Sequence, residues 1–176
     1  MEGKAQGDTL TRALLFGGSV SVTAISGRRL TERAIALHGL SPVCAAALGR
    51  TMLVAAVLAS ELKGDGDKLT VQIRGGGPIG SVVVSCDKKL DVRGYVSQPG
   101  LDLPLNAQGK LDVGGAVGRD GDLTVIKDLG LREPYVGRCQ LVSGEIGEDF
   151  ARYFTESEQQ PSAVALGVLV DRPRRG

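Results

Sequence analysis

The sequence predicts an α+β domain of three layers, in which two β-sheets sandwich a buried apolar helix. Glycine is frequent, at 26 of 176 residues, and separates short apolar runs, which is typical of strands joined by tight turns. Residues 42–63 are apolar around the whole helical circumference, and such a helix is buried on all sides. Residues 143–154 are apolar on one helical face only, so this second helix covers a sheet from outside.

A β-hairpin is expected first. Residues 12–16 and 19–26 form strand-like runs, and the glycine pair between them suits a two-residue turn. A short helix then begins with Thr31 as its cap and ends at His38, and Gly39 follows in the left-handed conformation. His38 is the only histidine, and we interpret it as a positive charge at the helix C-terminus.

The apolar helix begins at Ser41-Pro42, where serine accepts a first-turn N–H and proline leaves no donor unpaired. Arg50 and Glu61 mark the places where it meets solvent or an opposite charge. The longest stretch without a charged residue is 34–49, which is shorter than the roughly 20 apolar residues of a membrane span. The sequence therefore predicts no membrane span.

Strands of a meander fill much of the remaining chain. The glycine-rich run after Arg74 joins two strands and lacks the motif of a phosphate-binding loop, so it is interpreted as a turn. The amphipathic helix is capped by Ser143, and the helix dipole explains its acidic first turn of Glu145, Glu148 and Asp149. The predicted strands are residues 68–74, 79–86, 90–97, 123–128, 140–143 and 163–170, and a polar loop covers 98–109.

The composition limits the classes of function. The formal net charge is +1 and aromatic residues are only 3%, which argues against nucleic acid as a partner. No signal-peptide core is present near the N-terminus, so a cytoplasmic location is expected. The domain is expected over residues 10–171, between a flexible N-terminus at 1–9 and a basic tail at 172–176.

Three cysteines, Cys44, Cys86 and Cys139, lie far apart in the sequence. Without a closely spaced pair and with one histidine, they do not predict a zinc site, and we interpret them as buried apolar residues. No catalytic, cofactor-binding or metal-binding residue is predicted, and the chain is not expected to be an enzyme.

Nine motifs, in this order and spacing, resemble the N-terminal core domain of the heat shock protein 33 family. Coverage extends from about residue 10 to about residue 171. The motifs are AALGRT (46–51), KGD (63–65), KLTVQIRG (68–75), GYV (94–96), GKLDV (109–113), LTVIKDLG (123–130), EPY (133–135), LVSGEIGED (141–149) and SEQQPSA (157–163).

The resemblance implies a stress-response holdase, a chaperone that binds unfolding or oxidatively damaged proteins without ATP, and a possible homodimer. It also implies a redox switch built on four zinc-binding cysteines in a separate C-terminal module. Cys44, Cys86 and Cys139 do not match those cysteines, so a chain truncated before that module is expected to hold no zinc. Client-binding residues are not predicted. The alternatives are a small-molecule enzyme using Cys139 or His38, and a structural oligomerisation domain.

Overall fold

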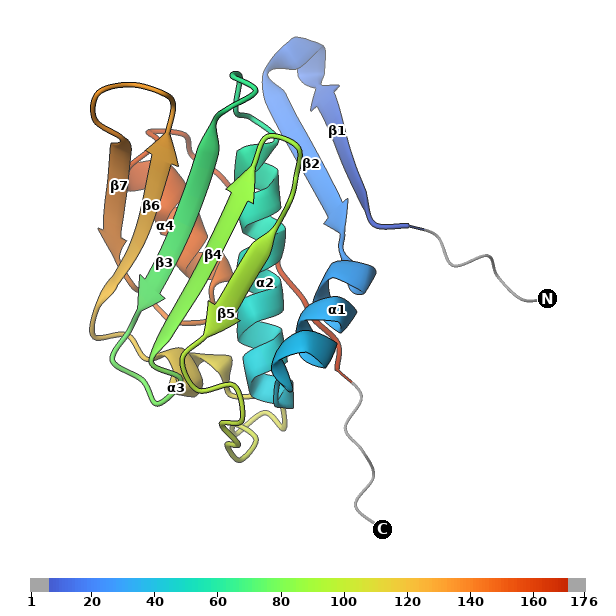
Figure 1. The fold of residues 1–176 in the computed structure, drawn as a ribbon, viewed down its shortest axis with the longest axis vertical. Helices are drawn as coiled ribbons and strands as arrows, with labels where there is room; N and C mark the ends of the chain where they lie inside the picture. Colours follow the sequence, from blue (N-terminus) through green and yellow to red (C-terminus); the bar gives the residue numbers. More distant parts are fainter. Residues whose placement is uncertain (1–6, 171–176) are drawn as a thin grey trace, which may run out of the picture.

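The computed structural model describes residues 7–170, which fold into two antiparallel sheets around a buried helix (Figure 1). The predicted three-layer α+β class is confirmed. The strands are β1 (Thr9–Leu15), β2 (Val20–Ser26), β3 (Lys68–Arg74), β4 (Ser81–Asp87), β5 (Arg93–Val96), β6 (Asp122–Asp128) and β7 (Tyr135–Gln140). The helices are α1 (Arg28–His38), α2 (Pro42–Ala59), α3 (Val113–Val117) and α4 (Gly147–Glu156).

The larger sheet has the order β5-β4-β3-β6-β7, with every neighbouring pair antiparallel. Strand alternation gives it one buried face. In β3 the side chains of Leu69, Val71 and Ile73 are buried, whereas Lys68 and Arg74 point to the opposite side and are exposed. The smaller sheet is the β1–β2 hairpin, which lies on the other side of α2 in Figure 1.

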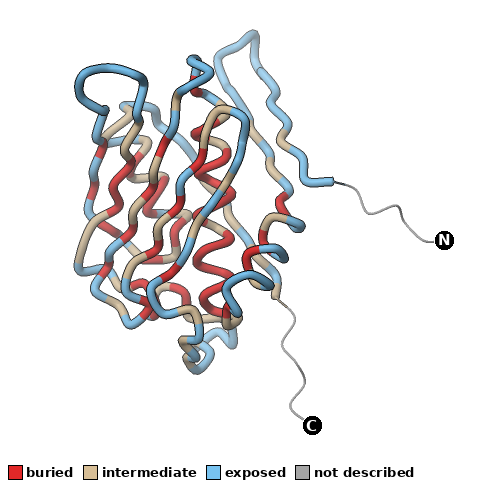
Figure 2. Tube along the Cα trace, in the orientation of Figure 1, coloured by how far each residue is buried: buried red, intermediate tan, exposed pale blue. Residues whose placement is uncertain are grey.

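Helix α2 forms the centre of the molecule. Fifteen of its 18 residues are buried, and it contacts the larger sheet, α1 and β2. It is also the one helix in residues 7–170 that is long and apolar enough to cross a membrane, although the sequence predicts no membrane span. Packing inside the protein accounts for that composition, since 83% of this helix is buried (Figure 2).

The N-terminal boundary of α1 differs from the prediction. The helix begins at Arg28 and not after Thr31, because the carboxylate of Asp8 accepts hydrogen bonds from the N–H groups of Arg29 and Leu30. A cap more than twenty residues away in the chain leaves no local signal. Asp8 and the first residue of β1 thus belong to the fold, although both were assigned to a flexible N-terminus, and the predicted tail at 172–176 lies outside the described residues.

The C-terminal end of α1 agrees with the prediction. His38 lies in the last turn, and Gly39 adopts the left-handed conformation with φ of 61°. The N-terminus of α2 also agrees, since the Ser41 hydroxyl accepts from the N–H of Cys44 at 3.3 Å. The predicted C-terminal end at residue 63 is wrong, because the helix ends at Ala59 and the Ser60 hydroxyl donates to the carbonyl of Val57.

Three further predicted elements differ from the structure, and one short helix is not predicted. A strand was predicted over residues 140–143, but β7 covers Tyr135–Gln140 and the following residues turn towards α4. The strand predicted over 90–97 is shortened to β5, because Leu90 adopts a positive φ of 64° that does not continue a strand. The hairpin turn spans residues 16–19 rather than the glycine pair alone. The short helix α3 lies in a part of the chain for which no helix is predicted.

The segment over residues 163–170, predicted as a strand, is extended but unpaired within the described chain. Its residues alternate in burial, with Val164, Leu166 and Val168 half-buried and their neighbours exposed. Val168 lies over α2 at Gly49, where an added Cβ would stand 2.9 Å from the valine side chain. The lack of a side chain at Gly49 therefore lets this segment approach the central helix.

Candidate functional site

The three cysteines are placed where they cannot act together. All are free and buried: Cys44 lies on α2, Cys86 on β4 and Cys139 on β7. Two strands separate β4 from β7, and the register places Cys86 level with Tyr135, four residues before Cys139. The two cysteines therefore lie roughly 20 Å apart across the sheet, too far for a disulfide or a shared zinc ion. Within residues 7–170 no three histidine, cysteine or acidic side chains form a metal-binding group, so these residues do not fit the zinc site of the resembled family.

Burial also suppresses thiol reactivity. Desolvation raises the pKa of Cys86 to about 12, and the nearby carboxylates of Asp87 and Asp91 add to the effect. Desolvation likewise raises the pKa of Cys139 to about 11, and it raises the pKa of Cys44. Because the thiolate is the nucleophile, all three positions are unsuited to covalent catalysis near neutral pH.

His38 has no catalytic partner in the described chain. It is exposed at the end of α1, and its ring makes no hydrogen bond or ion pair within residues 7–170. A general base needs an oriented imidazole that is hydrogen-bonded to a nucleophile, and the ring of His38 makes no such bond to a cysteine of residues 7–170. The geometry thus brings together none of the residues on which an enzymatic interpretation would depend.

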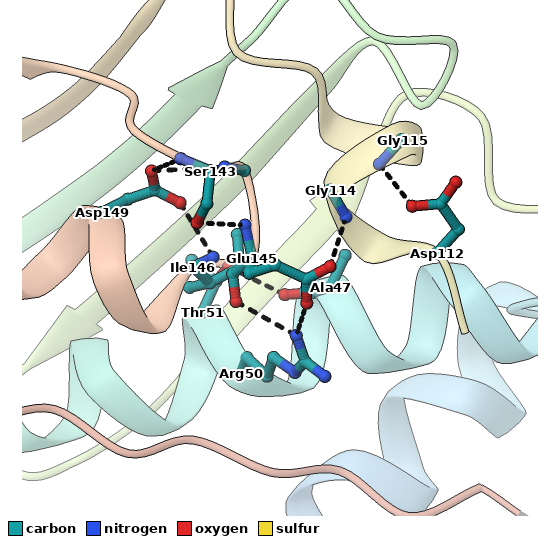
Figure 3. A network of polar contacts seen from close by, with 11 residues as sticks. Ala47, Arg50, Thr51, Asp112, Gly114, Gly115, Ser143, Glu145, Ile146 and Asp149 are labelled. Atoms are coloured by element: carbon teal, nitrogen blue, oxygen red, sulfur yellow. Dashed lines mark hydrogen bonds and ion pairs between the residues drawn. The ribbon is translucent and has the colours of Figure 1, made fainter. Parts of the chain in front are cut away.

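A polar network joins α2 to the loop before α4 (Figure 3). The guanidinium of Arg50, 18% exposed, donates to the carboxylate of Glu145 at 2.6 Å and to its backbone carbonyl at 3.1 Å. The other carboxylate oxygen of Glu145 accepts from the N–H of Gly114 in α3 at 2.9 Å. This confirms that Arg50 meets an opposite charge, and it gives Glu145 a specific partner in place of the helix dipole.

Asp149 holds the same loop from inside (Figure 3). Its carboxylate is fully buried, and one oxygen accepts N–H groups from Val142, Ser143 and Gly144 at 2.7 to 3.3 Å. The other oxygen accepts from Ile146 at 2.9 Å. The dipole interpretation of Asp149 was therefore incomplete, and the predicted cap at Ser143 is wrong, because Asp149 satisfies the loop N–H groups before α4. The network holds the loop and α3 against α2, and the Nε of Arg50 is the one buried side-chain polar atom within residues 7–170 that has no hydrogen-bond partner.

The hairpin presents an exposed apolar surface. Alternation along β1 and β2 places Ala13, Leu15, Val20 and Val22 on one face, and all four are exposed. Phe16 at the tip is 81% exposed and has a positive φ of 52°, which is uncommon for an aromatic residue. Figure 2 shows that most of the hairpin stands clear of the buried core.

A groove of about 580 Å³ separates α1 from the edge of the larger sheet. Its lining is mostly apolar, with the polar side chains of Arg33, His38 and Arg93 at the rim and without an acidic side chain. The apolar lining includes Leu30, Ala34 and Leu37 of α1, Met52 of α2, and Gly94 and Tyr95 of β5.

A second groove, of about 660 Å³, lies between the end of β2, the start of α1 and the extended segment at 163–170. Its lining mixes apolar residues, such as Ile25 and Val168, with the charged pair Arg28 and Glu32. Neither groove was predicted from the sequence, since each combines residues from distant segments. The exposed surface of the hairpin, in contrast, has a local signal in the sequence, the apolar run Leu14-Leu15-Phe16 at the turn.

Comparison with known proteins gives a consistent result. Residues 8–176 match the family described as Hsp33 protein. The chain is 50% identical over 165 residues to the 33 kDa chaperonin of Ruminiclostridium cellulolyticum and 51% identical over 162 residues to that of Alkaliphilus metalliredigens. These alignments cover 94% and 92% of this chain and 56% of each relative, so the chain spans about half their length.

A solved structure agrees with these matches. The crystal structure of the 33 kDa chaperonin from Thermotoga maritima, a heat shock protein 33 homologue, superposes with a TM-score of 0.86 at 44% sequence identity. The superposition covers 91% of this chain and 55% of that one.

Proposed function

The chain belongs to the Hsp33 family, and from this premise we propose that it is the client-binding core of an ATP-independent chaperone. In this proposal it binds unfolding or oxidatively damaged proteins in the cytoplasm and prevents their aggregation. It acts as a holdase, that is, by occupying exposed apolar surface of the client without a chemical reaction. The protein acts as a monomer or as a homodimer.

The observation that carries the proposal is the apolar surface left exposed on a folded domain. The outer face and tip of the hairpin expose Leu15, Phe16, Val20 and Val22, and a mostly apolar groove opens beside α1. Burying apolar surface contributes about 25 cal/mol per Å², so a client patch of a few hundred Å² gains several kcal/mol. A contiguous exposed patch of this kind is typical of protein interaction sites.

Regulation by a zinc switch is not proposed for the residues of this chain. Its cysteines are buried on three separate elements, and the pKa of each is raised. We therefore propose that holdase activity of this chain is constitutive, present under reducing conditions and not increased by peroxide.

The test is light scattering of an enzyme that unfolds and aggregates on heating, with increasing amounts of this chain and without ATP. We expect aggregation to fall towards zero at a small molar excess. The Phe16→Asn variant is expected to suppress aggregation less, because asparagine tolerates the positive φ and removes the apolar tip. Leu131→Asn, at another exposed apolar position on the β6–β7 loop, is the matched control and is expected to act like the parent.

Two outcomes would contradict the proposal. No suppression at any ratio, with self-association in sedimentation, would favour a structural oligomerisation domain. Suppression that is blocked by a thiol reagent under native conditions would indicate that a cysteine participates, in line with the thiol-based alternative.

A further inference from the structure

We propose that an extended segment of an unfolded client binds as an added strand in the groove between β2 and residues 163–170, paired with the backbone of 163–170. This inference rests on the proposed function and identifies where, and in what conformation, one client segment is held. Its supports are an extended segment without backbone partners, a groove along that segment, and walls that suit a single extended chain.

Residues 163–170 form an extended backbone without pairing of its own. All eight residues, AVALGVLV, are apolar. An uninterrupted apolar run is typical of a strand that is paired on its edges and covered on both faces. Within residues 7–170, no backbone group of this segment makes a hydrogen bond to another backbone group, and no strand pairs with it. Such a backbone is a template for strand pairing.

One side of the segment is fixed and the other is open. Val164, Leu166 and Val168 are half-buried against the core, which holds the segment on the domain. Leu169 is 99% exposed, and a Cβ added at Gly167 would have no heavy atom within 4 Å beyond its chain neighbours. Val168 and Leu169 point to opposite faces and yet both line the groove, so the groove follows the edge of the segment, where its backbone groups lie.

The groove gives room beside this backbone. It measures about 660 Å³ and is lined by the four consecutive residues 167–170 and, from β2 and the start of α1, by Ile25, Ser26 and Gly27. One strand residue fills about 160 Å³, from a rise of about 3.3 Å, a strand spacing of about 4.8 Å and a sheet spacing of about 10 Å. The groove therefore accommodates roughly four residues of an added strand, which matches the length of the stretch that lines it.

The walls favour an unfolded chain. The segment passes α2 and ends beside α1 in Figure 1, so the groove lies between three elements and is suited to one extended chain rather than to a folded surface. Leu53 of α2 and Ile35 of α1 line it, so every second side chain of an added strand meets an apolar surface. The two charged residues of the lining, Arg28 and Glu32, form an ion pair at 2.7 Å and balance each other. Backbone pairing then gives affinity whatever the outward side chains are, which suits a chaperone with many clients.

The experiment measures fluorescence anisotropy of a fluorescein-labelled peptide that alternates valine with threonine. Two further peptides carry backbone N-methyl groups, one on the valines and one on the threonines. The N–H groups of these two sets point to opposite edges of a strand, so methylation of the set that faces residues 167–170 is expected to remove most binding. Peptides with glutamate or lysine in place of threonine are expected to bind the parent protein equally well, because the groove has no unbalanced charge.

Charge-swap variants locate the site. Directly opposite side chains on paired strands lie about 5 Å apart, so a charge at position 169 lies next to an outward side chain of the added strand. Leu169→Lys is expected to prefer the glutamate peptide about threefold, and Leu169→Glu is expected to prefer the lysine peptide to a similar degree. Leu131→Lys, at an exposed position on the β6–β7 loop, is the matched control and is expected to show no preference. Circular dichroism checks that each variant is folded, which is expected because both side chains are exposed.

Equal binding of the glutamate and lysine peptides by both Leu169 variants would overturn the site, and full binding of both N-methylated peptides would overturn strand addition. A parent dimer that Leu169→Glu converts to monomers would overturn the choice of occupant in favour of a second copy. Loss of peptide binding in a longer form of this protein would overturn it in favour of a segment of its own chain.

Aggregation assays separate this inference from the proposed function. Suppression of aggregation by the parent without peptide binding refutes the groove alone, whereas peptide binding without suppression refutes the holdase function.

Discussion

Asp149→Asn is expected to destabilise the domain, because the carboxylate of Asp149 is the only acceptor for four loop N–H groups. The substitution keeps the shape, and the asparagine oxygen can still accept from Val142, Ser143 and Gly144. The amide NH₂ then faces the N–H of Ile146, so two donors oppose each other where the carboxylate oxygen accepted at 2.9 Å.

The magnitude follows from that single exchange. Losing a buried hydrogen bond to a charged acceptor costs about 1.5–3 kcal/mol. For a domain of this size, each kcal/mol lowers the melting temperature by about 2–4 °C, so we expect Asp149→Asn to melt roughly 3–12 °C below the parent. Asp149→Ala leaves all four N–H groups without this acceptor and is expected to cost more.

The assay is thermal unfolding followed by circular dichroism, with urea unfolding to give the free energy. Glu148→Gln is the matched control: it makes the same change of charge one residue earlier, at an exposed position, and should melt close to the parent. If Asp149→Asn also melts within about one degree of the parent, the carboxylate does not hold the loop, and the stabilising role assigned to Asp149 is wrong.

Other predictions concern the core, the thiols and metal. Leu58→Asp is expected to abolish cooperative unfolding, because Leu58 is 2% exposed in the core. Losing its side chain costs roughly 2–5 kcal/mol, and an unpaired buried carboxylate adds to that cost. Glu61→Lys breaks only an exposed ion pair and should shift the melting temperature by a few degrees at most. Under native conditions at pH 8, a thiol reagent should label Cys86 and Cys139 at least a hundredfold more slowly than in denaturant. Native labelling should become faster as the pH rises towards the raised pKa values of these thiols. Rapid native labelling at pH 8 would contradict their burial. Elemental analysis of the purified chain should find no stoichiometric zinc, and one zinc per chain would overturn the separation of the cysteines. Peroxide should leave suppression of aggregation unchanged relative to dithiothreitol, and activation by peroxide alone would make Cys44, Cys86 or Cys139 a switch.

Local patterns predicted several elements closely. The alternation of Leu69, Val71 and Ile73 predicted β3 at its observed bounds, because strand periodicity reports directly which side chains face a core. Apolar residues all around the circumference of α2 predicted a helix buried on all sides, because helical periodicity likewise reports which side chains face a core. Ser41 and Gly39 marked helix ends correctly, since capping depends on residues next to the helix in the chain.

Errors arose where a distant residue decided the outcome. Asp8 caps α1 from before the hairpin, and the Asp149 carboxylate turns the backbone at residues 142–146 where a strand and a serine cap were predicted. The segment at 163–170 has the alternating burial of a strand but pairs with no strand within residues 7–170. Its periodicity predicts which side chains are buried, and it carries no information on whether a neighbouring strand is present.

The sequence by itself determined the family, the three-layer class and the burial of α2, because motif order, glycine spacing and apolar periodicity are all properties of the chain read in one direction. Only the tertiary structure decided where the grooves of the domain lie. The groove beside α1 exists because β5 ends a sheet whose strand order is β5-β4-β3-β6-β7 and because α1 lies next to that end. Leu37 and Arg93 lie more than fifty residues apart in the chain, and both line one groove because the tertiary structure brings α1 next to β5.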